Sequence, residues 1–189
     1  HFQVLDSPEI NAFAAPGGLI LVTRGMLRCC KTEDALAAVL AHEIAHVQNR
    51  DGLRAIKTSR LTTALTIIAA EGVKQAAGAD LAQLTQAFEG SVGDVVNTLV
   101  SSGYSRDLER QADENAITIL RRVGYNPSAL VDMLTVMKSQ LKPGSAGFGK
   151  THPDPQDRIN SIQALAGGPS KTAPPASRQA RFEQALRAI

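Results

Sequence analysis

Two histidines and an intervening glutamate are the residues of this sequence best suited to hold a metal ion and activate water. They form the pattern His42-Glu43-Ile44-Ala45-His46, HExxH. Residues four apart share one face of a helix, so both imidazoles can bind one ion. A hydrolytic zinc site takes three protein ligands and leaves a fourth position for water. Glu43 is then expected to act on that water as a general base.

A third ligand must come from another part of the chain. Of the two other histidines one is terminal and the other follows a loop, so a carboxylate is the expected donor. Glu109 and Asp113 are four residues apart on a second predicted helix, so Glu109 can bind the metal while Asp113 orients a histidine. The same segment read alone is typical of a solvated helix face. Glu71 and Glu89 stay open as alternative ligands.

His152 and Arg158 are candidate catalytic residues with more than one role open to each. His152 follows a loop rich in proline, glycine and serine. It can fill the open position of the metal in a resting state, donate to a developing oxyanion, or cap and pack locally. Arg158 can stabilise the oxyanion or pair with Asp113 or Asp157.

Two capped helices must position these side chains. Thr32 is a suitable cap for the first, whose apolar residues recur with a helical period, and this helix is expected to run to about Asp51. Ser105 is a suitable cap for the second, which carries Glu109 and is expected to end before Gly124.

Other segments predict shorter elements. Residues 2–5 alternate like a strand, and apolar runs at 10–14 and 19–22 around a Pro-Gly-Gly turn predict a hairpin. Further helices are expected from Asn126-Pro127 and from Asp154-Pro155. Because the first residues already form a strand pattern, we expect the chain to begin inside a domain.

Glycine-broken helices are expected over residues 54–102. They are rich in small and apolar residues and could form packed core, a lid over the cleft, or a face for a membrane surface or a partner. We predict a domain over 1–166, a linker over 167–177 and a short amphipathic helix over 178–189.

Composition excludes several classes of protein. The 189 residues carry a formal net charge of +2, which does not favour nucleic acid as a partner, and 43% hydrophobic residues are enough for a core. The longest apolar run, Ala35 to Ala41, is far shorter than the roughly 20 residues of a membrane-spanning helix. The adjacent Cys29 and Cys30 are expected to be buried thiols, because neighbouring cysteines suit neither a disulfide nor a metal site.

The sequence resembles the HtpX/BepA-like and CAAX-prenyl-endopeptidase group of gluzincin metallopeptidases, and its lack of spanning segments fits the soluble branch. The resemblance covers about residues 2 to 165. The matching motifs are Ile10-Asn11-Ala12-Phe13-Ala14 with Pro16-Gly17-Gly18, the HExxH, Glu109 with Asp113, Gly124-Tyr125-Asn126-Pro127, and Thr151-His152-Pro153 with Arg158.

The resemblance implies a ligand set and a place for the substrate. It implies one Zn²⁺ held by His42, His46 and Glu109, with Glu43 activating a zinc-bound water. It also implies that an extended polypeptide adds to the strand carrying Asn11, Ala12 and Phe13. From the residues alone, that strand would be taken for the packed core of a hairpin.

We therefore expect an α+β, mostly α-helical, zincin-like domain with a small antiparallel sheet. Its expected function is a zinc-dependent endopeptidase acting on unfolded or misassembled proteins. The family suggests protein quality control in the periplasm or cell envelope. The alternative is a latent zinc-containing chaperone or interaction module with little turnover. The expected partner is a polypeptide substrate, with association with a membrane surface left open.

Overall fold

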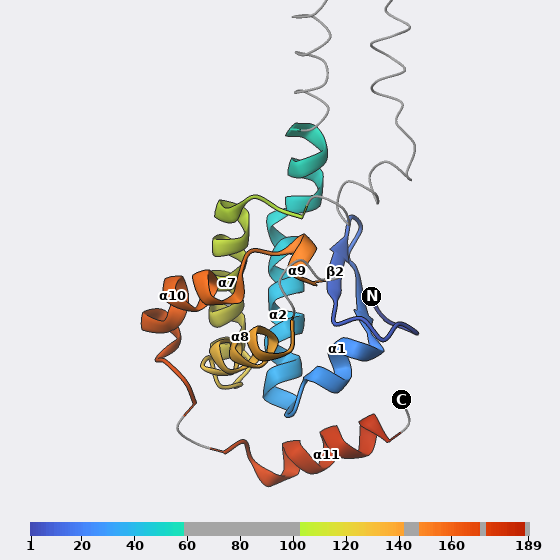
Figure 1. Ribbon diagram of the computed structural model, residues 1–189, viewed down its shortest axis with the longest axis vertical. Helices are drawn as coiled ribbons and strands as arrows, with labels where there is room; N and C mark the ends of the chain where they lie inside the picture. The colour runs from blue at the N-terminus through green and yellow to red at the C-terminus, as the bar shows by residue number, and fades with distance from the viewer. Residues whose placement is uncertain (59–102, 142–147, 171–172, 188–189) are drawn as a thin grey trace, which may run out of the picture.

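The computed structural model describes residues 1–58, 103–141, 148–170 and 173–187. Figure 1 shows helix α2 at the centre, with the sheet on one side and α7, α8 and α10 on the other. The elements in chain order are β1 (Phe2–Leu5), β2 (Ala12–Ala15), β3 (Leu19–Thr23), α1 (Arg24–Cys29), α2 (Glu33–Asn49), α7 (Arg106–Arg122), α8 (Ala129–Gln140), α9 (Phe148–Thr151), α10 (Pro155–Ala166) and α11 (Ala176–Leu186). The predicted α+β, mostly helical fold is confirmed.

The sheet is mixed rather than antiparallel, with the strand order β1-β3-β2. The predicted hairpin is present as the antiparallel pair β2 and β3, but β1 runs parallel to β3. The reason is that the connection from β1 to β2 crosses the end of β3. There the Thr23 hydroxyl lies 2.6 Å from the carbonyl oxygen of Glu9, and the Gly25 N–H donates to Ser7. A Cβ on Gly25 would lie only 2.2 Å from the Glu9 carbonyl oxygen, so the crossing requires a glycine.

Helix α2 begins where the sequence predicts and ends slightly earlier. The Thr32 hydroxyl accepts a hydrogen bond of 3.0 Å from the N–H of Ala35, which caps the first turn. Arg50 adopts a left-handed conformation with φ 57°, and its N–H bonds to the carbonyl groups of His46 and Val47. The chain then turns and is helical again over 51–58. The break at Arg50 therefore separates α2 from the helix over 51–58.

Two of the other predicted helix starts are confirmed and two are shifted. Ser105 caps α7 and Asp154 caps α10 through their side chains, as expected. The start at Asn126-Pro127 is wrong by two residues, because the Asn126 side chain accepts from the N–H of Ser128 and forms a turn before α8. Helix α11 begins at Ala176, two residues before the predicted start.

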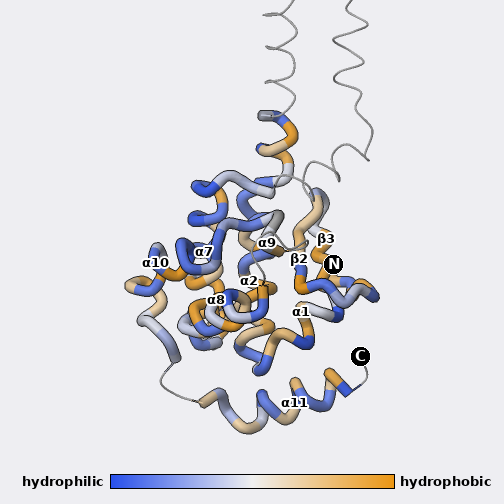
Figure 2. Tube along the Cα trace, in the orientation of Figure 1, coloured by the Kyte–Doolittle hydropathy of each residue, from blue (hydrophilic) through white to orange (hydrophobic). Residues whose placement is uncertain are grey.

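The core lies where α2 meets the sheet and the helices α7 and α8. The buried hydrophobic residues come largely from β3, α2, α7 and α8, and hydrophobic segments of β3 and α8 are coloured orange in Figure 2. Cys29 and Cys30 are buried free thiols, and burial raises the pKa of Cys30 to about 12, so the thiol stays protonated. Within the described ranges, no helix combines the length and apolar character needed to cross a membrane.

Candidate metal centre

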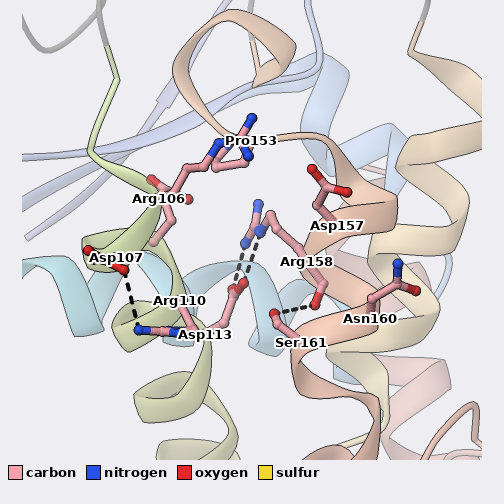
Figure 3. A pocket seen from close by; sticks show the side chains of 10 residues that line it. Arg106, Asp107, Arg110, Asp113, Pro153, Asp157, Arg158, Asn160 and Ser161 are labelled. Carbon is pink, nitrogen blue, oxygen red and sulfur yellow. Dashed lines mark hydrogen bonds and ion pairs between the residues drawn. The ribbon is translucent and has the colours of Figure 1, made fainter.

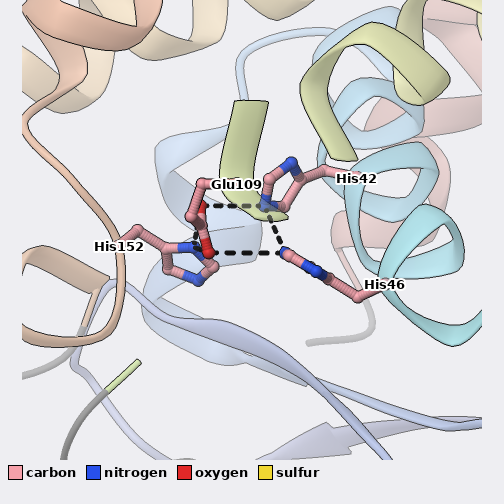
Figure 4. A group of neighbouring side chains, drawn as sticks. All are labelled: His42, His46, Glu109 and His152. Carbon is pink, nitrogen blue, oxygen red and sulfur yellow. Dashed lines mark hydrogen bonds and ion pairs between the residues drawn. The ribbon is translucent and has the colours of Figure 1, made fainter. Parts of the chain in front are cut away.

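Four buried side chains from three parts of the chain meet at one point. His42 and His46 come from α2, Glu109 from α7, and His152 from the turn after α9 (Figure 4). One potential ligand atom from each residue lies within 4.8 Å of the others. The Nε2 atoms of His42 and His46 are 3.1 Å apart, and each lies about 3.5 Å from a Glu109 oxygen. Two imidazoles and a carboxylate converging in this way suit a divalent metal ion.

The environment of Glu43 is a second observation that favours a catalytic site. Its side chain points from the same helix as the two histidines and is 1% exposed. Among the residues that the structure describes, neither of its carboxylate oxygens has a hydrogen-bond partner. Because a buried carboxylate without partners is costly, this arrangement fits a group that receives water or substrate.

His42 is held by a buried ion pair from two other helices. Its Nδ1 atom lies 2.9 Å from Asp113 Oδ1 on α7. Arg158 on α10 donates to both oxygens of Asp113, at 2.9 and 2.6 Å. Arg158 thus pairs with Asp113, one of the two partners left open by the sequence. Its Nη1 atom is buried and has no hydrogen-bond partner in the described ranges.

His46 is held by a residue that sequence reasoning missed. Its Nδ1 atom lies 2.9 Å from Asp51 Oδ2, and Asp51 is fully buried. The break at Arg50 turns the chain back so that Asp51 reaches the imidazole five residues earlier. An acidic residue at the expected end of the metal-binding helix was the available signal.

Tyr104 also reaches His46, although it was not included among the predicted site residues. Its ring stacks on the imidazole with the centroids 4.3 Å apart. Its hydroxyl lies 3.5 Å from the Ala14 carbonyl oxygen of β2. Burial raises the pKa of Tyr104, so its hydroxyl remains a donor.

The charges of the cluster shift the pKa values of its members in opposite directions. Burial and the Arg158 charge disfavour a protonated His42, but Asp113 and Glu109 outweigh them and raise the pKa of His42 to about 9. Burial alone would raise the pKa of Glu109, but the neighbouring histidines hold that pKa far below its usual range. The cluster therefore holds negative carboxylates ready for a cation.

His152 is buried against the carboxylate of Glu109. Its Nδ1 atom is 2.9 Å from Glu109 Oε2, and the Phe148 ring stacks on its imidazole with the centroids 4.1 Å apart. Of the three roles open to His152, this position suits a fourth donor best, because the ring faces the same carboxylate as the other two histidines.

Two clefts flank the centre. The first, of about 490 Å³, lies between α7 and the start of α10 on the Glu109 side, and charged side chains surround it (Figure 3). The second, of about 270 Å³, lies beside His46 and the β2–β3 turn.

The strand predicted to bind substrate forms one edge of the sheet. Asn11 is already engaged with β3, because its carbonyl accepts from the N–H of Thr23 and its N–H donates to the Thr23 hydroxyl. Phe13 is paired with Leu21 in the same register, so the alternation of an antiparallel ladder directs the main-chain groups of Ala12 and Ala14 away from β3. Of the three predicted substrate-binding residues, only Ala12 directs its main chain to the edge.

That edge is largely covered. Ala12 is 0% exposed, and the N–H of Phe148 in α9 donates to the carbonyl of Ile10 on the same edge. The Asn11 side-chain oxygen is buried and meets no hydrogen-bond donor from the residues that are described.

The alternative ligands Glu71 and Glu89, and the helices expected over most of 54–102, lie outside the described residues.

Comparisons with known proteins agree with this geometry. The model of peptidase family M48 matches residues 1–166. The β-barrel assembly-enhancing protease of Escherichia coli is 31% identical over 161 residues, which are 84% of this chain and 33% of that protein. The mitochondrial metalloendopeptidase OMA1 of Schizosaccharomyces pombe is 32% identical over 166 residues, 86% of this chain and 45% of that protein. The metalloprotease LoiP of Escherichia coli is 26% identical over 163 residues, which are 86% of this chain and 61% of that protein. The chain thus spans between a third and three fifths of these relatives.

Proposed function

Because the chain belongs to peptidase family M48 and is a metalloprotease, we propose that it hydrolyses internal peptide bonds of unfolded or misassembled proteins at a zinc ion held by His42, His46 and Glu109. The observation that carries this proposal is the buried Glu43 carboxylate, which has no hydrogen-bond partner within the described part of the chain and projects from the helix that bears both histidines. A purely structural metal site needs no such base.

Zinc fits the donor set better than a hard cation does. Two imidazoles with one carboxylate are a ligand combination of hydrolytic zinc enzymes, whereas calcium and magnesium prefer oxygen ligands alone. When bound, zinc would act as a Lewis acid that polarises the scissile carbonyl and makes water more acidic.

Glu43 moves the proton in this proposal. Its carboxylate takes a proton from the attacking water and passes that proton to the nitrogen of the leaving amine. The C–N bond breaks as this nitrogen becomes protonated. Because Glu43 is buried and unpartnered, no competing hydrogen bond weakens it as a base.

Asp113 and Arg158 support the reaction in different ways. Asp113 holds the His42 imidazole by its Nδ1 atom, which leaves Nε2 directed at the cluster. Arg158 is fixed by Asp113 through Nε and Nη2. Its Nη1 is left without a partner, and we assign it to the developing oxyanion.

In this proposal, the position of His152 corresponds to a resting state of the enzyme. Its contact with Glu109 brings a fourth potential donor to the three proposed ligands. The turn that carries His152 also covers the β2 edge through Phe148. A substrate strand would displace this turn and bond to the main chain of Ala12 and Ala14, with the Asn11 amide as a further contact.

The substrate class and the location follow the relatives. Several are named β-barrel assembly-enhancing proteases, so we extend to this chain a role in protein quality control in the cell envelope. The same contact of His152 with Glu109 favours one second candidate, a latent zinc-containing chaperone or interaction module.

Cleavage of a denatured protein by the metal-loaded chain tests the proposal. The comparison is between the wild type and Glu43→Gln, with bound zinc quantified in each. We expect the wild type to cleave and the variant to retain zinc without cleaving. Glu114→Gln, which changes an exposed glutamate of α7, should behave as the wild type.

Other outcomes separate the candidates. If both proteins hold zinc and neither cleaves, His152→Ala is measured next, and activity in that variant supports the latent enzyme. If the wild type binds no zinc after loading, the assignment of His42, His46 and Glu109 as ligands is wrong.

A further inference from the structure

The cleft beside His46 has a composition that suits an apolar side chain. Its walls include Pro16 from the β2–β3 turn, Val47 from α2, Leu53 from the 51–58 helix and the ring of Tyr104. The remaining lining is mostly alanine and glycine, and the cleft encloses about 270 Å³. Binding pockets are typically apolar with a few polar groups that fix orientation, and here His46 and Arg50 are the polar members.

The cleft is continuous with the proposed reaction centre. His46, a proposed metal ligand, forms part of its wall, and so does Ala14, whose main chain lies on the edge of β2 that does not pair with β3. A substrate strand bound along that edge would pass the mouth of the cleft close to the metal. Side chains of an extended strand point alternately to opposite faces, so a residue near the scissile bond would point to the α2 side, where the cleft lies.

Tyr104 forms a wall of the cleft, and its position is fixed by several contacts. Its ring stacks on His46, and its hydroxyl reaches the Ala14 carbonyl oxygen. Gly103, just before it, has φ 62°, and a Cβ there would lie 2.1 Å from the Thr151 carbonyl oxygen. The backbone next to Tyr104 is thus fixed by a close approach that only glycine permits.

We propose that this cleft is a specificity pocket that takes one apolar side chain of the polypeptide substrate next to the scissile bond. This inference rests on the proposed peptidase function. The pocket selects medium-sized apolar residues such as leucine over glycine and over charged residues. Gly52 sets its width, because a Cβ there would lie 3.3 Å from Pro16 Cγ and 3.5 Å from the Tyr104 hydroxyl oxygen.

Two substitutions should change the selectivity in opposite directions. Gly52→Val narrows the cleft, so kcat/KM for the best leucine-containing peptide should fall about 10-fold, with less than a 3-fold change for the matched alanine peptide. Leu53→Ala removes a side chain that is 52% exposed, so it should widen the cleft and favour phenylalanine over leucine. Leu165→Ala, a change at a 42% exposed leucine of α10, should leave the preference unchanged.

The assay uses the metal-loaded 189-residue chain and peptides that carry glycine, alanine, leucine, phenylalanine or aspartate at each position around the cleaved bond. A wild type without an apolar preference at any position would overturn the pocket. An equal loss on all peptides in Gly52→Val would also overturn it, because the substitution would then have damaged the centre generally.

A second readout does not depend on turnover. Metal-loaded Glu43→Gln is mixed with a peptide that carries an apolar photo-cross-linker at the selected position, and the adducts are mapped by mass spectrometry. We expect adducts on Val47 or Leu53, reduced in the Gly52→Val background. Adducts elsewhere overturn the pocket. If the peptide cross-links in the cleft but the wild type cleaves no peptide, the proposed pocket stands and the proposed peptidase function is wrong.

Discussion

The two histidines of the metal centre are supported in contrasting ways. His42 is held by Asp113 on α7, which is itself paired with Arg158 on α10. His46 is held by Asp51, only five residues further along the chain. One support thus joins three helices, whereas the other is completed within a single stretch of chain.

The surroundings of the two carboxylates differ as well. Both oxygens of Asp113 accept hydrogen bonds from Arg158, and this ion pair is almost fully buried. Within the described residues Asp51 Oδ1 accepts no hydrogen bond, and the Arg54 side chain, which lies 3.5 Å from it, is 57% exposed. We infer that the His42 side couples metal binding to the assembly of the fold, whereas the His46 side mainly tunes one ligand.

The largest expected effect is on the His42 side. Arg158→Leu should lower the free energy of unfolding by about 3–5 kcal/mol, because the buried Asp113 carboxylate loses its arginine and keeps only the His42 imidazole as a partner. Denaturant unfolding of the metal-free protein measures this loss. The double variant Arg158→Leu with Asp113→Leu should recover much of the stability, since it removes both buried charges. Equal stability of wild type and Arg158→Leu would refute the coupling.

On the His46 side, the expected effect is on metal affinity. Asp51→Asn should weaken zinc binding about 10- to 100-fold, because the buried carboxylate that orients His46 and increases its basicity is lost. Competition with a chromogenic chelator measures the affinity. Asp6→Asn, which changes an 84% exposed aspartate, serves as the control. Unchanged affinity in Asp51→Asn would mean that the short contact with His46 is not functional.

The pH dependence should follow His42. In the folded metal-free protein its pKa is raised from 6.5 to about 9, so the stabilisation is complete below pH 6.5 and is lost as the pH rises towards 9. Zinc needs a neutral imidazole, so zinc affinity should rise over the same range. Thermal unfolding of the metal-free and zinc-loaded protein from pH 6 to 9.5 tests both signs. A flat profile for the metal-free protein would contradict the raised pKa.

The smallest effect is expected for Arg54→Ala. Its contact with Asp51 is long and solvent-exposed, so the loss in free energy of unfolding should be about 0–1 kcal/mol. Denaturant unfolding beside Arg158→Leu gives the direct contrast. A loss as large as that of Arg158→Leu would show that the two supports do not differ as described.

Much of the fold was predictable from local signals. Thr32, Ser105 and Asp154 cap helices because their side chains satisfy backbone N–H groups a few residues away, which requires nothing distant. The β2–β3 hairpin follows in the same way from alternation around a glycine turn. The parallel pairing of β1 was not predictable, since it depends on a loop crossing at Thr23 and Gly25 that no local pattern encodes.

In the metal site, the sequence determines the spacing of side chains along a helix, whereas the tertiary structure determines the contacts between helices. The sequence by itself determined that His42 and His46 share a helix face with Glu43 between them, because 3.6 residues per turn leave no other arrangement. Only the tertiary structure decided that Asp51 turns back to His46, that Arg158 pairs with Asp113, and that His152 faces Glu109. The last two contacts join residues more than 40 positions apart, and packing of the helices brings them together. The contact of Asp51 with His46 depends on the left-handed turn at Arg50, a conformation that no residue type at that position announces.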